Sequence, residues 1–120
     1  MSLKLLLGEN VDRVYKTQLL QRVSDITVVI VCEPIAPRKG TLDPEILCWC
    51  EQNNFVLITN NRSTMPVHLA DHLAQGRHVP GILVLNANLS IGRNLDELTL
   101  IAQASFDNEY RDRIEHLPLP

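Results

Sequence analysis

The sequence lacks an apolar run long enough to cross a membrane. Its longest apolar stretches, such as residues 28–32, are far shorter than the ~20 residues that a membrane-spanning helix needs. Residues 1–4 also lack the long apolar stretch and the small-residue cleavage site of a signal peptide. We therefore expect a cytoplasmic protein with no membrane partner.

The chain also lacks an excess of basic charge and a cysteine framework. Eleven lysine and arginine residues face 14 aspartate and glutamate residues, for a formal net charge of −3. This balance argues against a broad basic face for non-specific nucleic-acid binding, but not against a small acidic site that reaches phosphates through a divalent cation. Three cysteines leave one unpaired, so we interpret Cys32, Cys48 and Cys50 as structural thiols.

The sequence contains a regular alternation of strand and helix patterns. Runs of apolar and β-branched residues predict strands, and apolar residues at helical spacing predict helices. The predicted strands cover residues 3–7, 25–32, 55–59, 81–85 and 114–117, and the predicted helices cover residues 11–23, 44–53, 67–75 and 94–105. The alternation predicts one α/β domain over residues 1–120, a three-layer α/β/α sandwich with a mainly parallel sheet.

Polar side chains follow several of the predicted strands, where α/β proteins usually place their sites. Residues 60–63, after the third strand, offer two carboxamides, an arginine and a hydroxyl, but no carboxylate. Acids occur at two other junctions, as Glu9 after the first strand and as Asp43 and Glu45 at the start of the second helix. Asp43 is also a good helix cap, with Pro44 at the first helical position. The pattern indicates a carboxylate metal site from which part of the acid set is missing.

Four segments in this order resemble the small bacterial PIN-like proteins, relatives of VapC-type toxin nucleases. The family pattern is a strand ending Asp-Glu-Asn, a helix start like Ser-Asp-Glu-Glu-Ile-Leu, a strand ending Thr-x-Asp-x-Asp, and later Pro-Gly-Ile-x-x-Leu. The matching segments are residues 8–10, 42–47, 59–63 and 80–85, so the resemblance covers nearly the first 90 residues. The family's first aspartate falls on Gly8, and its third-strand aspartates fall on Asn61 and Ser63.

The resemblance implies a PIN-like fold and a metal-dependent endoribonuclease of the toxin–antitoxin type. Clustered carboxylates in such enzymes hold Mg²⁺ or Mn²⁺ ions that activate water and neutralise phosphate charge. Glu9 and Asp43 would hold the ion here, and Asn61 would add a neutral carbonyl ligand.

The resemblance also implies partners and a substrate surface. RNA would be the substrate, with Arg62 and Ser63 near the phosphate and with Arg38 and Lys39 adding positive charge from the preceding loop. An antitoxin-like protein and a second copy of the chain, as a homodimer, are the other partners implied. An adjacent reading frame of antitoxin type would support this interpretation.

The replaced acids favour an alternative, which is a non-catalytic binding or regulatory module that kept the fold and lost the metal site. Each candidate also has a structural interpretation. Glu9 and Glu45 suit the positive start of a helix, Asn61 suits a turn, and Arg62 suits a solvated surface.

The histidines give a third, weaker pattern. His68 and His72 are four residues apart, so they share a helix face, and His78 lies nearby in the sequence. This spacing fits a two-histidine metal site, but Leu69 stands where the His-Glu-x-x-His motif has its glutamate. A surface role, or contact with residues 60–64, is the favoured interpretation.

Overall fold

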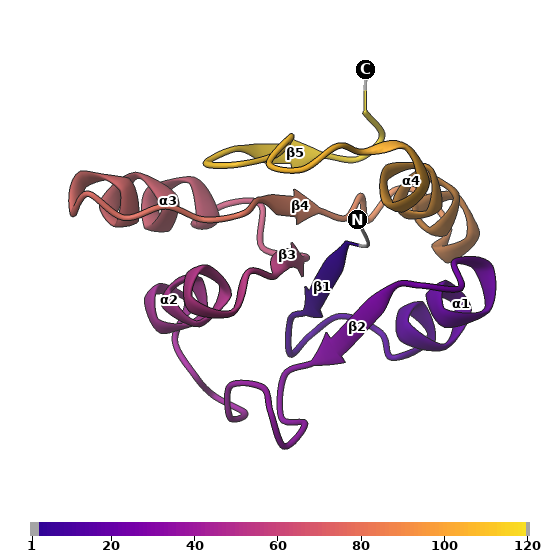
Figure 1. Ribbon diagram of the computed structural model, residues 1–120, viewed down its shortest axis with the longest axis horizontal. Coiled ribbons are helices and arrows are strands. Elements are labelled where there is room, and N and C mark those ends of the chain that lie inside the picture. The colour runs from indigo at the N-terminus through magenta and orange to yellow at the C-terminus, as the bar shows by residue number, and fades with distance from the viewer. Residues whose placement is uncertain (1–2, 120) are drawn as a thin grey trace.

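Residues 3–119 of the computed structural model form five strands and four helices, in strict alternation (Figure 1). The strands are β1 (Lys4–Leu7), β2 (Thr27–Ile30), β3 (Val56–Thr59), β4 (Ile82–Val84) and β5 (Ile114–His116). The helices are α1 (Val14–Arg22), α2 (Asp43–Asn53), α3 (Met65–Ala74) and α4 (Ile91–Ala104). All strand pairs are parallel, in the order β2-β1-β3-β4-β5. The predicted α/β class is confirmed.

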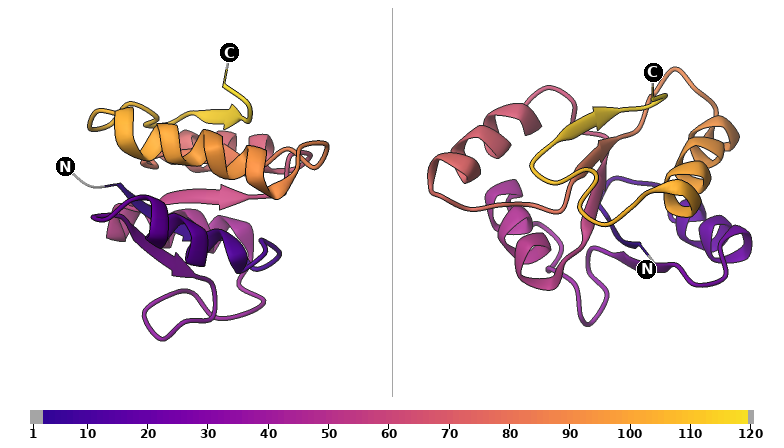
Figure 2. Two further views of the ribbon diagram at one scale, coloured as in Figure 1. Left: turned by 90° about the vertical axis from the view of Figure 1, so that its right-hand side faces the viewer. Right: turned by 45° about the horizontal axis from the view of Figure 1, so that its top comes forward.

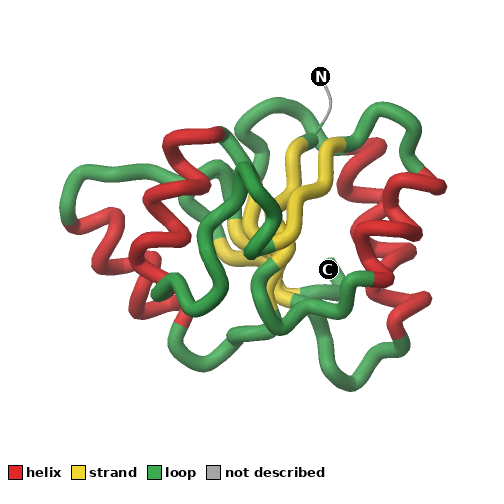
Figure 3. The backbone as a smooth tube through the Cα atoms, turned by 90° about the horizontal axis from the view of Figure 1, so that it is seen from below, coloured by secondary structure: helices red, strands yellow, loops and turns green. Residues whose placement is uncertain are grey.

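The sheet is covered on both faces, because alternate residues of its strands point to opposite sides. Leu5 and Leu7 pack with α1 and α4 in one apolar cluster, whereas Leu6 packs with α2 and α3 in the other. Figure 3 shows the two helix pairs on either side of the strands. This arrangement is compatible with the predicted three-layer sandwich.

The connections reverse direction next to β1. Helix α1 leads from β1 outward to β2, and α2 then crosses back over the other face to β3, on the far side of β1. In such doubly wound sheets, a crevice opens at the carboxyl ends of the two strands where the winding reverses. The residues that follow β1 and β3 therefore meet at one end of the sheet.

Helix starts differ from the sequence-based boundaries for local reasons. The prediction that Asp43 caps α2 is wrong, because Leu42 is the cap residue and Asp43 is already helical. Helix α4 begins at Ile91, three residues earlier than predicted, because the Ser90 hydroxyl accepts a hydrogen bond from the Arg93 backbone N–H at 3.1 Å. As a helical residue, Asp43 has a side chain that remains available for other contacts.

The cysteines fall into different environments. Cys50 is buried in the cluster beneath α2, and this burial raises the pKa of its thiol to about 12, as expected of an inert core residue. Cys32 is exposed, with a positive φ of 86°, so the burial expected of a structural thiol is not found at this position. Among residues 3–119, no helix is both long and apolar enough to span a bilayer.

Candidate functional site

A polar pocket of about 250 Å³ lies where the winding of the sheet reverses. The loops after β1 and β3 form two of its walls, and the start of α2 forms a third. Its lining residues are Gly8, Glu9, Asn10, Val11, Thr41, Asp43, Ile46, Leu57, Thr59, Asn60 and Asn61. Three predicted site residues, Glu9, Asp43 and Asn61, are therefore brought together.

The side chain of Glu9 is tied to the loop before α2. Its Oε1 accepts a hydrogen bond from the backbone N–H of Gly40 at 2.6 Å, across 31 residues of sequence. On the opposite wall, the Asn60 side-chain NH₂ donates to the Asn10 carbonyl at 2.9 Å. These two bonds hold the three loops of the pocket in place.

Asn61 is the most heavily bonded side chain of the pocket. Its Oδ1 accepts from the Thr64 backbone N–H at 3.1 Å, at the start of α3. Its Nδ2 donates to Asp43 Oδ2 at 3.0 Å and to Thr64 Oγ1 at 2.7 Å. A backbone N–H can only donate, so the Thr64 bond fixes which end of the amide is oxygen. Asn61 thus meets Asp43 with its NH₂ group, not with its carbonyl.

His68 also approaches Asp43, with its Nε2 3.6 Å from Asp43 Oδ2. Sequence reasoning placed His68 near residues 60–64 but gave it no acid partner. The sequence does indicate that His68 lies near the loop that carries Asn61, because His68 lies on the first turns of α3, just after that loop.

In this arrangement Glu9, Asp43 and Asn61 do not form a ready site for Mg²⁺ or Mn²⁺. Such ions take oxygen ligands, yet the Asn61 oxygen is held by Thr64 and its NH₂ faces Asp43. Each of the two acids already accepts a hydrogen bond from the protein. Among residues 3–119, no group of three or more histidine, cysteine, aspartate or glutamate side chains is placed to hold a metal.

Gly8 lies in close contact with the backbone of β3. Its N–H donates to the Ile58 carbonyl at 2.9 Å, and a Cβ built on it would lie 3.3 Å from the same oxygen. The chain passes so close to β3 that a side chain would press on the neighbouring backbone.

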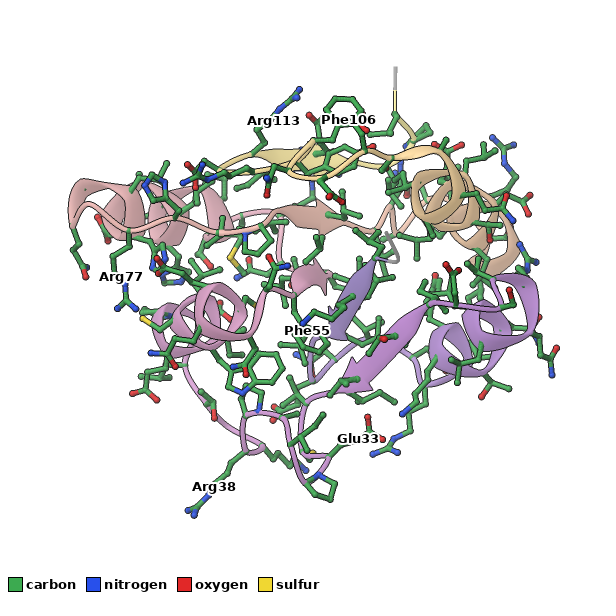
Figure 4. All side chains as sticks on the ribbon, in the orientation of Figure 1. Glu33, Arg38, Phe55, Arg77, Phe106 and Arg113 are labelled. Carbon is green, nitrogen blue, oxygen red and sulfur yellow. The ribbon has the colours of Figure 1, made fainter. Side chains whose placement is uncertain are left out.

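The predicted substrate-binding residues do not line the pocket. Arg38, Lys39, Arg62 and Ser63 are all exposed, and Figure 4 shows Arg38 projecting from its loop into solvent. Within the described chain, none of the three basic side chains forms an ion pair. They stand on the same loops that carry the pocket residues Thr41 and Asn61.

A second polar cluster ties α2 and α3 to the loops before β4 and β5. Glu51 Oε1 lies 3.1 Å from Nε2 of the buried His72 and 3.0 Å from Nε of Arg77. His78 Nδ1 lies 2.7 Å from Asp112 Oδ2. His68 and His72 therefore contact different acids, Asp43 and Glu51, which gives no support to a shared two-histidine metal site.

The acids of this second cluster have shifted pKa values. Burial alone would raise the pKa of Glu51, but the His78 backbone N–H and the Arg77 guanidinium outweigh it and lower the pKa. The pKa of Asp112 is also lowered, because the effect of burial is outweighed by the bonds of this carboxylate to the His78 side chain and the Val79 backbone N–H. Both carboxylates are thus stabilised in the charged form by the fold.

Comparison with known proteins gives no match, whether to family models, to curated proteins or to solved structures.

Proposed function

We propose that this chain is a PIN-like, non-catalytic binding module whose pocket and flanking loops bind single-stranded RNA. The observation that carries the proposal is the hydrogen bond from the Asn61 NH₂ to Asp43. A donor at this point supplies the positive partner that a cation would supply in the family that the sequence resembles. The pocket is thereby satisfied by its own side chains.

The support for RNA as the ligand comes from the flanking loops. Arg38 and Lys39 before α2, and Arg62 before α3, present positive charge without an internal ion pair in the described chain. Such side chains contact phosphates, and their binding weakens as salt rises. With a net charge of −3, binding depends on this local group of cations and is strongly sensitive to salt.

The test combines RNA binding with metal titration. Fluorescence anisotropy with a labelled single-stranded RNA should show binding that R62E and K39E weaken about tenfold or more, whereas R93E on α4 leaves it unchanged. Calorimetry with Mn²⁺ should give no dissociation constant below about 1 mM. Absence of RNA binding in the wild type would contradict the proposal.

A metal-dependent ribonuclease is the competing function, because Glu9 and Asp43 line one pocket. It requires RNA cleavage in Mn²⁺ that EDTA abolishes and that E9Q and D43N both remove. The binding module requires no cleavage in any of the three proteins while RNA binding is kept. An antitoxin-like partner and residence in the cytoplasm remain predictions under both functions.

A further inference from the structure

The edge strands β2 and β5 differ in the hydrogen bonding of their outward-facing backbone groups. On the β2 edge, the Ile30 N–H donates to Glu33 Oε1 at 2.6 Å, and the Ile30 carbonyl accepts from the Glu33 N–H at 3.0 Å. Lys16 holds the same carboxylate at 2.8 Å. The following turn therefore closes the end of the β2 edge, which is how proteins prevent a free edge from pairing with another chain.

The β5 edge is open. The Arg113 carbonyl accepts from Ile82 and the Leu117 N–H donates to Val84, so the odd-numbered residues face β4. The backbone groups of Ile114 and His116 then point away from β4. No hydrogen bond within residues 3–119 uses them, and Figure 2 shows β5 at the outer side of the molecule.

The charges on either side of Ile114 are complementary between two antiparallel copies of this segment. Arg113 is basic and Glu115 is acidic, on either side of Ile114. In an antiparallel pair centred on Ile114, Arg113 of each copy lies opposite Glu115 of the other. These are non-hydrogen-bonded positions, where side chains are closest, and opposite charges there stabilise the pair. Centring on Glu115 would instead set the two glutamates against each other.

We propose that two copies of this chain associate through β5, as an antiparallel pair centred on Ile114 that joins the two sheets. A two-fold axis relates the copies, so each contributes the same surface. The proposal does not depend on the function of the pocket. Because β5 has only three residues, the contact is small, and we expect a weak dimer whose population rises with concentration.

The first experiment measures the mass of the protein by sedimentation equilibrium from about 1 μM to about 1 mM, the range that covers weak interfaces. The wild type should pass from monomer to dimer. R113E and E115R each place like charges opposite one another, so each should weaken association about tenfold or more. R93E, a matched charge reversal on α4, should associate like the wild type.

The second experiment mixes the two single variants. The R113E chain carries negative charges at positions 113 and 115, and the E115R chain carries positive charges at both positions. Each should form less homodimer than the wild type, but the mixture should form a heterodimer with every cross-strand pair complementary. Native mass spectrometry separates these species by mass. Recovery in the mixture cannot come from the Arg113–Glu115 pair within one chain (2.7 Å), because neither variant has it.

A backbone variant tests the hydrogen bonds themselves. I114P removes an N–H that faces away from β4, so the ladder to β4 remains, and it should abolish the dimer. I114A truncates the same side chain but keeps this N–H and should still associate. A wild type that stays monomeric throughout would overturn the proposal. A dimer that R113E and I114P leave unchanged, or variants that do not recover on mixing, would also overturn it.

Discussion

At the scale of single residues, the proposed function of the pocket depends most on Asn61. Its amide makes two kinds of contact, since the oxygen accepts from the backbone N–H of Thr64, the residue before α3, and the NH₂ donates to Asp43. An aspartate at this position could keep the first contact, but its second oxygen would face a like charge. The choice of asparagine or aspartate at position 61 thus decides whether the pocket is hydrogen-bonded by its own side chains or binds a cation.

We therefore predict that N61D gains affinity for Mn²⁺ and loses stability without it. A second carboxylate about 3.0 Å from Asp43 Oδ2 would repel it, and we expect the metal-free variant to lose about 1 kcal/mol of unfolding free energy. A bound cation offsets this repulsion and raises the melting temperature in proportion to its binding. Thermal unfolding with and without Mn²⁺ measures both effects.

N61A is the control, because it removes the amide without adding charge and should show no response to Mn²⁺. An equal rise in melting temperature for wild type and N61D would contradict this view of the pocket, since the native residues would then already bind the ion.

The sequence identified the pocket at this scale but not its bonding. Glu9, Asp43 and Asn61 were grouped correctly because each follows a strand or opens a helix at the same end of the sheet. The direction of the Asn61 amide depends on Thr64, and no sequence pattern encodes which end faces Asp43. The hydrogen bond from Gly40 to Glu9 could not be predicted from the sequence either, since it joins residues 31 positions apart.

At the scale of elements, the cluster around Glu51 and Asp112 is the main polar connection. Glu51 on α2 reaches His72 on α3 and the backbone N–H of His78. Asp112 holds His78 and the Val79 N–H. The two carboxylates therefore link two helices to the loops that lead into β4 and β5.

This linkage predicts a loss of stability in acid. The pKa values of Glu51 and Asp112 are lowered in the folded chain, below the unfolded values of about 4.3 and 3.9. Their contribution is therefore complete above about pH 5 and is lost as the pH falls through the lower folded pKa values. Urea unfolding at several pH values should show wild type more stable than E51Q near neutrality, with the difference shrinking below about pH 4.

E45Q is the control, because Glu45 is an exposed carboxylate with no ion pair in the described chain. Its difference from wild type should stay small at every pH. A difference for E51Q that persists unchanged at about pH 3 would show that Glu51 acts through packing and not through its charge.

The elements themselves were predicted well, because apolar periodicity reports directly on burial. Their ends were not, since they depend on single hydrogen bonds. Helix α1 begins three residues late because Asp12 Oδ1 accepts from the Val14 N–H at 2.9 Å, and α4 begins three residues early because of Ser90. Such local contacts compete with the apolar pattern at each boundary.

At the scale of the whole molecule, the strand order is what places the site. A parallel alternating sheet follows from the pattern of strands and helices, but the order β2-β1-β3-β4-β5 arises from crossovers that the sequence does not display. This order sets β1 beside β3 and so brings Glu9 near Asn61. That residues 1–120 form a single domain is a further prediction about the whole molecule.

Substitutions on the two faces of β1 test whether the molecule unfolds as one unit. Leu5 and Leu6 are both fully buried, but Leu5 belongs to the cluster under α1 and α4 and Leu6 to the one under α2 and α3. We expect L5A and L6A each to lose about 2–5 kcal/mol of unfolding free energy. Far-ultraviolet circular dichroism follows the whole chain, whereas the fluorescence of Trp49, the one tryptophan, follows the α2 face.

Both probes should give the same unfolding midpoint in each variant, because the two clusters share the strands of one sheet. L5A is the informative case, since it damages the face that Trp49 does not report. A fluorescence midpoint left at the wild-type value while circular dichroism shifts would mean that the two faces unfold separately. A common shift would mean that a change on the α1 and α4 face lowers the stability of the α2 face, which holds Asp43, by the same amount.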